Sequence, residues 1–281
     1  MVDFTIKETY DLNDFRRIME VLRGPGGCPW DAEQTHESIR KDLLEEAYEL
    51  AQAIDRQDKE NLKEELGDVL MQVLFHARIE EEQGSFDIND VADAAVKKLV
   101  FRHPHVFGDV KAENSQQVLD TWDAVKRVEK SQATVGSAMS DVAETLPALW
   151  RAEKVQKKAA KVGFDWPEVS GALDKLREET GELCQAIEAN DRENMEEEIG
   201  DILFSAVNAA RFLKVDPEKA LHKACEKFIR RFRYLEEAAL SQGRALEDMS
   251  LAEMELLYQL ARHELEGKEM QLPLDNQGNI C

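Results

Sequence analysis

Apolar residues recur every three or four positions along most of the chain, the spacing that places them on one face of an α-helix. In the first half, this pattern predicts helices over residues 12–23, 43–54, 62–79, 88–102 and 115–130. Gly24 to Gly27 and the turn around Gly84 separate helices, because glycine favours turns. No stretch alternates apolar and polar residues over the length of a strand, so the sequence predicts an all-α fold.

The helical pattern begins again in the second half of the chain. It predicts helices over residues 149–161, 173–189, 194–213, 218–240 and 250–265. Residues 176–212 align without a gap to residues 43–79, and about half of the aligned residues are identical. The chain is therefore an internal duplication. We expect a first domain over 1–130, a linker over 131–146 that begins with small uncharged residues, and a second domain over 147–281.

Both copies keep two acidic pairs, one on each of two neighbouring predicted helices. In the first copy, Glu46 and Glu49 lie on one flank of the apolar stripe of their helix. Glu65 and Asp68 lie on the same-handed flank of the next helix. The short polar connection between these helices predicts an antiparallel pair, which allows the four carboxylates to meet. The second copy repeats the arrangement with Glu179, Glu182, Glu198 and Asp201.

A single glutamate pair with this spacing is most often solvated surface, whereas its recurrence in both copies favours a functional centre. Four converging carboxylates repel one another unless protons or cations neutralise them. Oxygen ligands without histidine or cysteine select Mg²⁺, with Mn²⁺ as a second candidate. We therefore predict a Mg²⁺ site in each copy. The apolar stripes beside it, which include Ile54, Leu66, Ile187 and Ile199, are expected to face another layer of helices.

A substrate that carries phosphate also needs fixed positive charge. Lys98 and Arg102 lie four residues apart on the fourth predicted helix of the first copy, and Lys227 and Arg231 have this spacing in the second. Such a spacing puts both side chains on one helix face. Any one such pair is ordinarily solvated surface, but the match between the copies favours phosphate binding.

Three further residues, Lys175, Trp30 and Trp166, are candidates for roles other than solvated surface. Lys175 stands just before the acidic helix of the second copy, where the first copy has Asp42, and this favours the second copy as the one that binds an anionic substrate. Trp30 and Trp166 precede the acidic helices and are expected to be core anchors rather than rings that stack on a base.

The formal net charge of −22 over 281 residues limits the classes of partner. Nucleic-acid polymers and anionic membranes are bound through Lys and Arg, so neither is expected. No apolar run approaches a membrane span, and the first residues have no apolar signal segment. We expect a cytoplasmic protein.

Several longer segments accompany the acidic pairs, namely GPGGCPWD, RHPHVFGD, VGFDWP, EEEIGD and KFIRRF. Over nearly the whole chain, this set resembles the MazG family of nucleoside triphosphate pyrophosphohydrolases in its long bacterial form with two copies. The resemblance implies tandem four-helix-bundle-like repeats and an intertwined homodimer. It also implies Mg²⁺-dependent hydrolysis of ribo- and deoxynucleoside triphosphates, ATP included, to monophosphate and diphosphate. Such an activity cleanses the nucleotide pool.

Transferred residue by residue, the resemblance makes both acidic sets metal ligands. These are Glu46, Glu49, Glu65, Asp68, Glu179, Glu182, Glu198 and Asp201. It implies that Lys175, Lys227 and Arg231 contact the nucleotide phosphates. It also implies that the second copy is the catalyst.

The resemblance assigns further roles around the second acidic set. Glu178 and Glu197, together with Glu179, are candidates for catalytic roles that orient water or ligands. Tyr258 stands where family members carry a tryptophan against the nucleotide, and Asn194 stands where they carry a lysine.

Two other readings remain open. One is a different all-α pyrophosphohydrolase, with a dUTPase-like or phosphoribosyl-ATP pyrophosphatase activity. The other is a non-catalytic helical dimer that binds a metal–nucleotide complex as a sensor.

Overall fold

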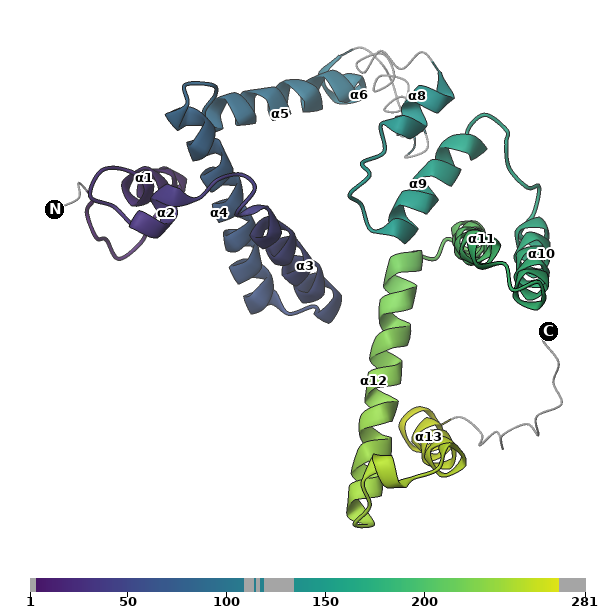
Figure 1. The fold of residues 1–281 in the computed structure, drawn as a ribbon. Coiled ribbons are helices and arrows are strands. Elements are labelled where there is room, and N and C mark those ends of the chain that lie inside the picture. The colour runs from purple at the N-terminus through teal and green to yellow at the C-terminus, as the bar shows by residue number, and fades with distance from the viewer. Residues whose placement is uncertain (1–3, 109–113, 115–116, 119–133, 268–281) are drawn as a thin grey trace. The chain divides into compact units, whose positions relative to one another are not determined.

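The structure is a computed structural model, which describes residues 4–108, 114, 117–118 and 134–267. The chain forms two compact units, residues 1–126 and 127–281 (Figure 1). The described residues contain α-helices and a 3₁₀ turn but no strand, which confirms the predicted all-α fold. Most of the helix predicted over 115–130 lies outside the described residues. Within the described ranges, no helix has both the length and the apolarity needed to cross a membrane.

The first unit contains helices α1 (Leu12–Arg23), α2 (Pro29–Glu33), α3 (Arg40–Arg56), α4 (Lys59–Glu82), α5 (Ile88–Arg102) and α6 (Pro104–Phe107). The helices predicted over 12–23 and 88–102 have the bounds of α1 and α5, and α3 and α4 are a few residues longer than predicted. The sequence pattern does not predict α2 and α6. Each is shorter than two turns and begins with a proline. In a sequence pattern a proline indicates the end of a helix, but proline is also favoured at the first position of a helix.

A tight turn joins α3 to α4 and holds them side by side. Gln57 ends α3 in the left-handed region with a φ of 56°, and Asp58 begins α4 by accepting from the backbone N–H of Asn61 at 3.2 Å. The second unit repeats this turn at Asn190, with a φ of 54°, and Asp191. The predicted antiparallel helix pair is therefore confirmed in both copies.

The core of the first unit lies between α1 and α4. Met19, Leu74, Phe75 and Ile79 are buried there together with Ile39, the residue before α3. This core holds the C-terminal half of α4. The N-terminal half, which carries Glu65, is left to pack against α3.

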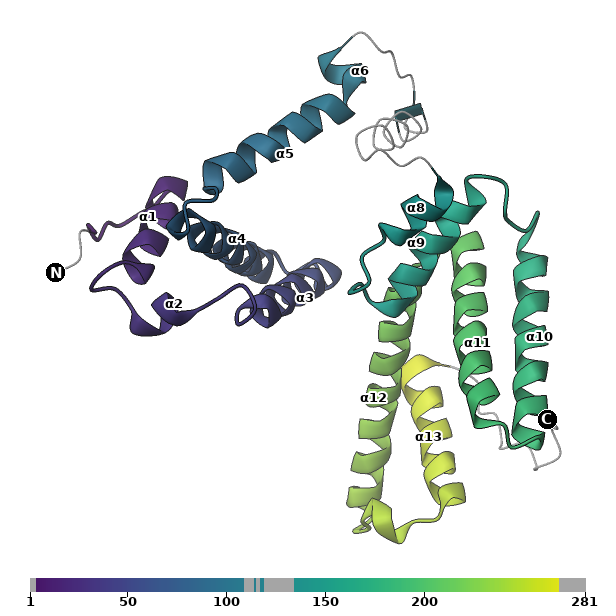
Figure 2. The same ribbon diagram turned by 45° about the horizontal axis from the view of Figure 1, so that its top comes forward.

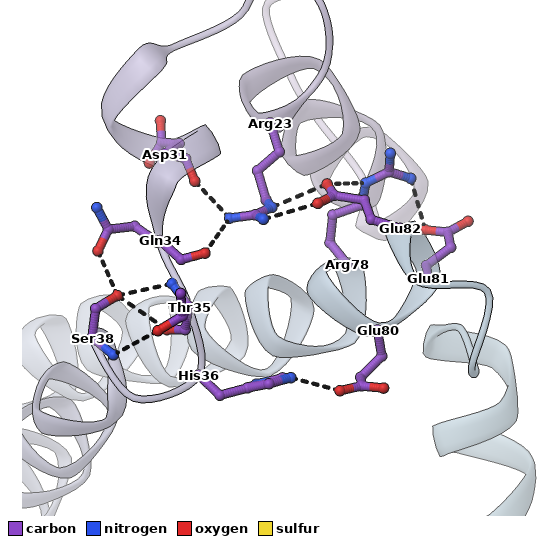
Figure 3. Close-up of polar contacts among 10 residues, drawn as sticks. All are labelled: Arg23, Asp31, Gln34, Thr35, His36, Ser38, Arg78, Glu80, Glu81 and Glu82. Carbon is purple, nitrogen blue, oxygen red and sulfur yellow. Dashed lines mark hydrogen bonds and ion pairs between the residues drawn. The ribbon is translucent and has the colours of Figure 1, made fainter.

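A buried arginine ties α1 to the end of α4 (Figure 3). Arg23 Nε and Nη2 donate to the Glu82 carboxylate at 3.0 and 2.8 Å. Arg23 Nη1 donates to the carbonyl oxygens of Asp31 and Gln34 at 2.6 and 3.1 Å. The guanidinium carbon also lies 5.1 Å from the centroid of the Phe75 ring. Arg23 thus fixes the segment that leads into the acidic helix α3.

Two histidines tie the same segment to α4. His36 Nδ1 lies 2.7 Å from His76 Nδ1, and the ring planes differ by 7°. His36 Nε2 lies 2.7 Å from a carboxylate oxygen of Glu80 (Figure 3). His36 Nε2 donates to Glu80, because an ionised carboxylate only accepts, and the short distance between the two Nδ1 atoms requires that one of them carries the proton. Burial, and then the neighbouring His36, lower the pKa of His76.

The second unit contains α8 (Val135–Ser140), α9 (Ala148–Ala160), α10 (Val169–Glu188), α11 (Arg192–Phe212), α12 (Pro217–Ser241), the 3₁₀ turn η1 (Leu246–Asp248) and α13 (Leu251–Glu266). Helix α8 falls within the stretch predicted as a linker and packs on α9, with Ala138 and Val142 buried. Six residues are too few for a periodic pattern, so the sequence does not predict it. The domain boundaries at 130 and 147 stay a prediction.

Helices α12 and α13 form a second hairpin, and Figure 2 shows α13 running alongside α12. Leu235 and Ala239 of α12 pack with Leu257 of α13 in a small core of their own. This hairpin brings residues that are about 30 positions apart into contact, which matters for the basic residues of α12.

The apolar stripes beside the acidic pairs are not buried within the described part of the chain. Ile54 and Leu66 in the first copy, and Ile187 and Ile199 in the second, are about half exposed. The expectation that these stripes face another layer of helices is not met by the described helices of one chain. Their burial requires a surface from elsewhere.

The buried Arg23 predicts a large loss of stability on truncation. Arg23→Ala leaves the Glu82 carboxylate and two backbone carbonyl oxygens without this donor, so we expect a loss of about 2 kcal/mol or more in the free energy of unfolding. Denaturant unfolding followed by circular dichroism measures it. The matched control is Arg17→Ala on the same helix, whose half-exposed side chain pairs with Glu20 and should cost less than about 1 kcal/mol. Equal losses in the two variants would contradict the role of Arg23.

Candidate metal centres

Three of the four predicted carboxylates come together in each copy. Glu179 and Glu182 of α10 meet Glu198 of α11, and each offers a carboxylate oxygen within 4.8 Å of the other two. Glu46, Glu49 and Glu65 form the same group between α3 and α4. The angular argument from the sequence thus correctly identifies the flanks that face each other across the helix pair.

The second-copy group is more deeply buried than the first. Glu179 and Glu198 are only 4% and 8% exposed, whereas in the first copy Glu65 is 7% exposed and Glu49 is exposed. One carboxylate oxygen of Glu198, Oε2, is buried and has no hydrogen-bond partner. A buried acceptor without a donor is costly unless a cation or a proton occupies the site. The donor set, three carboxylates with an unsatisfied oxygen, fits a hard divalent cation such as Mg²⁺.

Lys175 gives the second copy an internal cation. Its Nζ lies 2.8 Å from Glu179 and 3.0 Å from Glu178. The hydrogen bond from Lys175 is the main reason why the pKa of Glu179 is lowered. The same two glutamates raise the pKa of Lys175, so the ammonium stays charged. Lys175 therefore keeps Glu179 ionised.

The two other members of this group hold protons more readily. A hydrogen bond to Glu179, followed by burial, raises the pKa of Glu182. Burial and then the charge of Glu179 raise the pKa of Glu198. In the first copy, burial and the surrounding carboxylates raise the pKa of both Glu46 and Glu65. Both centres thus carry more negative charge than their protein surroundings stabilise.

The fourth predicted ligand of each copy lies outside the group of three. Asp68 raises the pKa of Glu46 and Glu65, and Asp201 raises the pKa of Glu198, so both aspartates are near enough to act electrostatically. Asp201 is exposed. Their assignment as metal ligands stays a prediction.

The other predicted acidic positions lie at the edge of the second-copy group. Glu178 is mostly exposed and pairs with Lys175. Glu197 is exposed and contributes to the raised pKa of its neighbour Glu198. The carboxylates of both residues are therefore exposed to water and lie close to the group formed by Glu179, Glu182 and Glu198.

The predicted basic pairs have different environments. Lys98 is exposed on α5 and Arg102 is half-buried near its end. On α12, Lys227 is exposed, whereas Arg231 is only 7% exposed. Arg231 contacts Glu266 and Tyr258 of α13, which places two of the predicted substrate-binding residues, Arg231 and Tyr258, side by side.

The expectation that both tryptophans are core anchors is wrong. Trp30 is 60% exposed and Trp166 is 45% exposed. Both lie in or just before short segments that lead into the acidic helices, and such segments run along the surface. One face of the Trp166 ring packs so closely on Gly171 that a Cβ there would lie 2.8 Å from the ring.

Sequence reasoning missed Glu266 as a contact of the basic residues. Its signal is weak, because Glu266 lies 35 residues from Arg231 and near a chain end that has no periodic pattern. The capping box of Ser250 and Glu253 is readable in the sequence and marks the start of α13, but it does not indicate which helix α13 packs against.

The fold and the site define a class: a duplicated all-α protein in which each copy holds a carboxylate centre between two antiparallel helices. Comparison with known proteins identifies the family. The sequence matches the MazG nucleotide pyrophosphohydrolase domain over residues 34–107 and 169–235, one match in each copy. The chain therefore belongs to the MazG family.

Curated relatives agree with this assignment. A nucleoside triphosphate pyrophosphohydrolase/pyrophosphatase MazG of Thermotoga maritima is 45% identical over 245 residues, which cover 87% of this chain and 93% of the relative. A nucleoside triphosphate pyrophosphohydrolase of Escherichia coli K12 is 46% identical over 252 residues, with 88% and 95% covered. The uncharacterized protein YabN of Bacillus subtilis is 49% identical over 254 residues, with 90% and 52% covered.

The raised pKa of Glu182 makes a prediction about metal and pH. A carboxylate with a raised pKa binds more protons folded than unfolded, so stability falls as the pH rises through that pKa. In Glu182→Gln the amide donates to Glu179 without needing a proton. We expect the metal-free variant to melt about 2 °C above the unmodified protein at pH 8, and to lose most of the stabilisation by Mg²⁺ or Mn²⁺.

Thermal melts at pH 5 and pH 8, with and without metal, test this expectation. Glu188→Gln, at the exposed end of the same helix, is the control and should respond to metal as the unmodified protein does. An unchanged response of Glu182→Gln to metal would remove Glu182 from the site.

Proposed function

We propose that the protein is a nucleoside triphosphate pyrophosphohydrolase that works in the cytoplasm. It would hydrolyse ribo- and deoxynucleoside triphosphates between the α and β phosphates, giving nucleoside monophosphate and diphosphate. The observation that carries the proposal is the buried three-carboxylate group of Glu179, Glu182 and Glu198 beside Lys175. The names of the two-copy relatives, nucleoside triphosphate pyrophosphohydrolases, support it.

The second copy is the proposed catalyst. Lys175 supplies a cation beside its carboxylates, and the corresponding position of the first copy is Asp42, which adds negative charge instead. A triphosphate would therefore meet less repulsion at the second centre than at the first. The first centre is proposed to be structural or to act on a different substrate.

In the proposed reaction, each residue has a role set by its position. Bound Mg²⁺ would neutralise phosphate charge and lower the pKa of a water molecule. Glu179, Glu182, Glu198 and Asp201 would hold it. Glu178 or Glu197, outside the buried group, would accept the proton of the attacking water.

Positive groups of the second copy would bind the rest of the substrate. Lys175 lies beside the buried carboxylates and would contact the phosphates there. Lys227 and Arg231 of α12 would hold the departing diphosphate. Tyr258 would lie against the nucleoside. In the first copy, Lys98 and Arg102 are proposed to bind phosphate in the same way.

Product analysis tests the reaction. We expect each nucleoside triphosphate, incubated with protein and Mg²⁺ in ¹⁸O-labelled water, to give labelled monophosphate and unlabelled diphosphate, because attack at the α-phosphorus puts the new oxygen on the monophosphate. Label in orthophosphate would place the attack at the γ-phosphorus and contradict the proposal. Turnover of dUTP alone would favour a dUTPase-like enzyme, and turnover of phosphoribosyl-ATP alone the phosphoribosyl-ATP pyrophosphatase. Binding without turnover would favour a nucleotide sensor.

Matched variants assign the reaction to a copy. Glu179→Gln should lower kcat by at least about 100-fold, since it removes a charged ligand of the catalytic metal, while Glu46→Gln should retain most activity. Glu188→Gln is the control on α10. If only Glu46→Gln were inactive, the assignment to the second copy would be wrong.

We further propose that the protein is a homodimer. Ile187 of α10 and Ile199 and Leu203 of α11 leave an apolar surface beside the carboxylates in the described part of the chain. Exposed large apolar residues that gather on one helix pair are typical of an interface between subunits. A second copy that covers it would also shield the centre from water.

Light scattering after gel filtration tests the dimer. We expect twice the mass of one chain, and we expect Leu203→Glu to shift the protein towards monomer and to lower activity together. Val162→Glu, at an exposed apolar residue in the turn after α9, should leave the mass unchanged. A monomeric unmodified protein with full activity would refute the proposal.

A further inference from the structure

Arg231 is already bound to an anion. Its Nε and Nη2 donate to the two carboxylate oxygens of Glu266 at 2.7 and 2.6 Å, a fork-to-fork pair. Its Nη1 lies 3.4 Å from the hydroxyl oxygen of Tyr258, and its guanidinium carbon lies 5.4 Å from the centroid of that ring. The side chains of Arg231 and Glu266 are only 9% and 10% exposed. The edge of the guanidinium that would bind phosphate is therefore occupied.

A carboxylate and a phosphate present the same pair of oxygens to an arginine fork. Phosphate can bind the Nε and Nη2 edge of Arg231 only after Glu266 leaves it. Arg230 precedes Arg231 and is mostly exposed. Its Nη2 lies 3.6 Å from Oε1 of Glu266, so it also contributes to holding Glu266 in place.

The place of Glu266 in the fold allows it to leave. It is the last residue of α13, and Gly267 ends the helix in the left-handed region with a φ of 62°. The last turn of a helix has carbonyl groups without helical partners and opens at low free-energy cost. Arg231 lies inside α12, which runs on for ten residues to Ser241, so its backbone is held by helical turns on both sides.

We propose that Glu266 is a specificity-determining residue that competes with phosphate for Arg231. The inference rests on the proposed function, in which Arg231 holds diphosphate. A ligand must replace a carboxylate of one negative charge. Diphosphate, with more charge and further contacts to Lys227 and metal, does so more readily than a single phosphate. Glu266 would thus favour substrates that offer a diphosphate to Arg231 over those that offer a single phosphate.

Calorimetric titration of the full chain tests the proposal, with diphosphate and orthophosphate as probes in the presence of Mg²⁺. Glu266→Gln removes the competing charge, so we expect its affinity for diphosphate to rise about tenfold and its affinity for orthophosphate to become measurable. Glu264→Gln, on the same helix and exposed, is the matched control and should bind as the unmodified protein does. In Glu266→Gln with Arg231→Gln, the gain should be absent.

The direction of the change separates competition from a purely structural role. Loss of a structural contact would loosen the α12–α13 hairpin and weaken diphosphate binding, whereas loss of a competitor strengthens it. Unchanged or weaker binding by a folded Glu266→Gln overturns the proposal. If circular dichroism shows that this variant is unfolded, Glu266→Asp decides in the same way, because its shorter side chain reaches the fork less well. Turnover by the unmodified protein is scored separately, so that a failure of this inference is distinct from a failure of the proposed function.

Discussion

Repulsion among carboxylates is the constraint on which the rest of the site depends. Each copy brings three glutamates to within 4.8 Å across a pair of antiparallel helices, and two of the three in the second copy are buried. The tight turns at Gln57 and Asn190 fix the two helices of each pair in register, so the carboxylates cannot separate by sliding. Protons, Lys175 or a cation must supply the missing positive charge. Lys175 neutralises only part of the negative charge, because the pKa values of Glu182 and Glu198 are still raised.

The parts of the structure that the sequence predicts are those governed by local rules. Helices α1 and α5 have the predicted bounds because aspartates with reciprocal caps, at Asp11 and Asp87, start them where the apolar period begins. Helix geometry places the carboxylates on same-handed flanks, which in an antiparallel pair point either toward or away from each other. The structure has them pointing toward each other. The duplication strengthened the prediction, because both copies carry their acidic pairs on the same flank of the apolar stripe.

Contacts between distant positions lie beyond such rules. The His36–His76 pair joins positions 40 residues apart, and the Arg231–Glu266 pair joins positions 35 apart. In neither pair does a periodic pattern in the sequence predict which two residues will be in contact. The tryptophans show the opposite error: size and apolarity favour burial, yet the segments that carry Trp30 and Trp166 run along the surface. The exposed Ile187 and Ile199 fail for a third reason, because the surface proposed to cover them belongs to another chain.

The duplication separates what the fold requires from what chemistry requires. Both copies keep the turn, the stripes and the three glutamates, so these suffice to build a helix pair with a carboxylate centre. The second copy has Lys175 where the first has Asp42, which reverses the charge beside the centre. Lys175 lowers the pKa of Glu179 and so favours its ionised form. A similar ion pair lies on α12. The hydrogen bond to Glu266 raises the pKa of Arg231, so Arg231 stays charged although its side chain is buried. In both places, the proposed substrate meets an ion pair that is already assembled and has to exchange one partner in it.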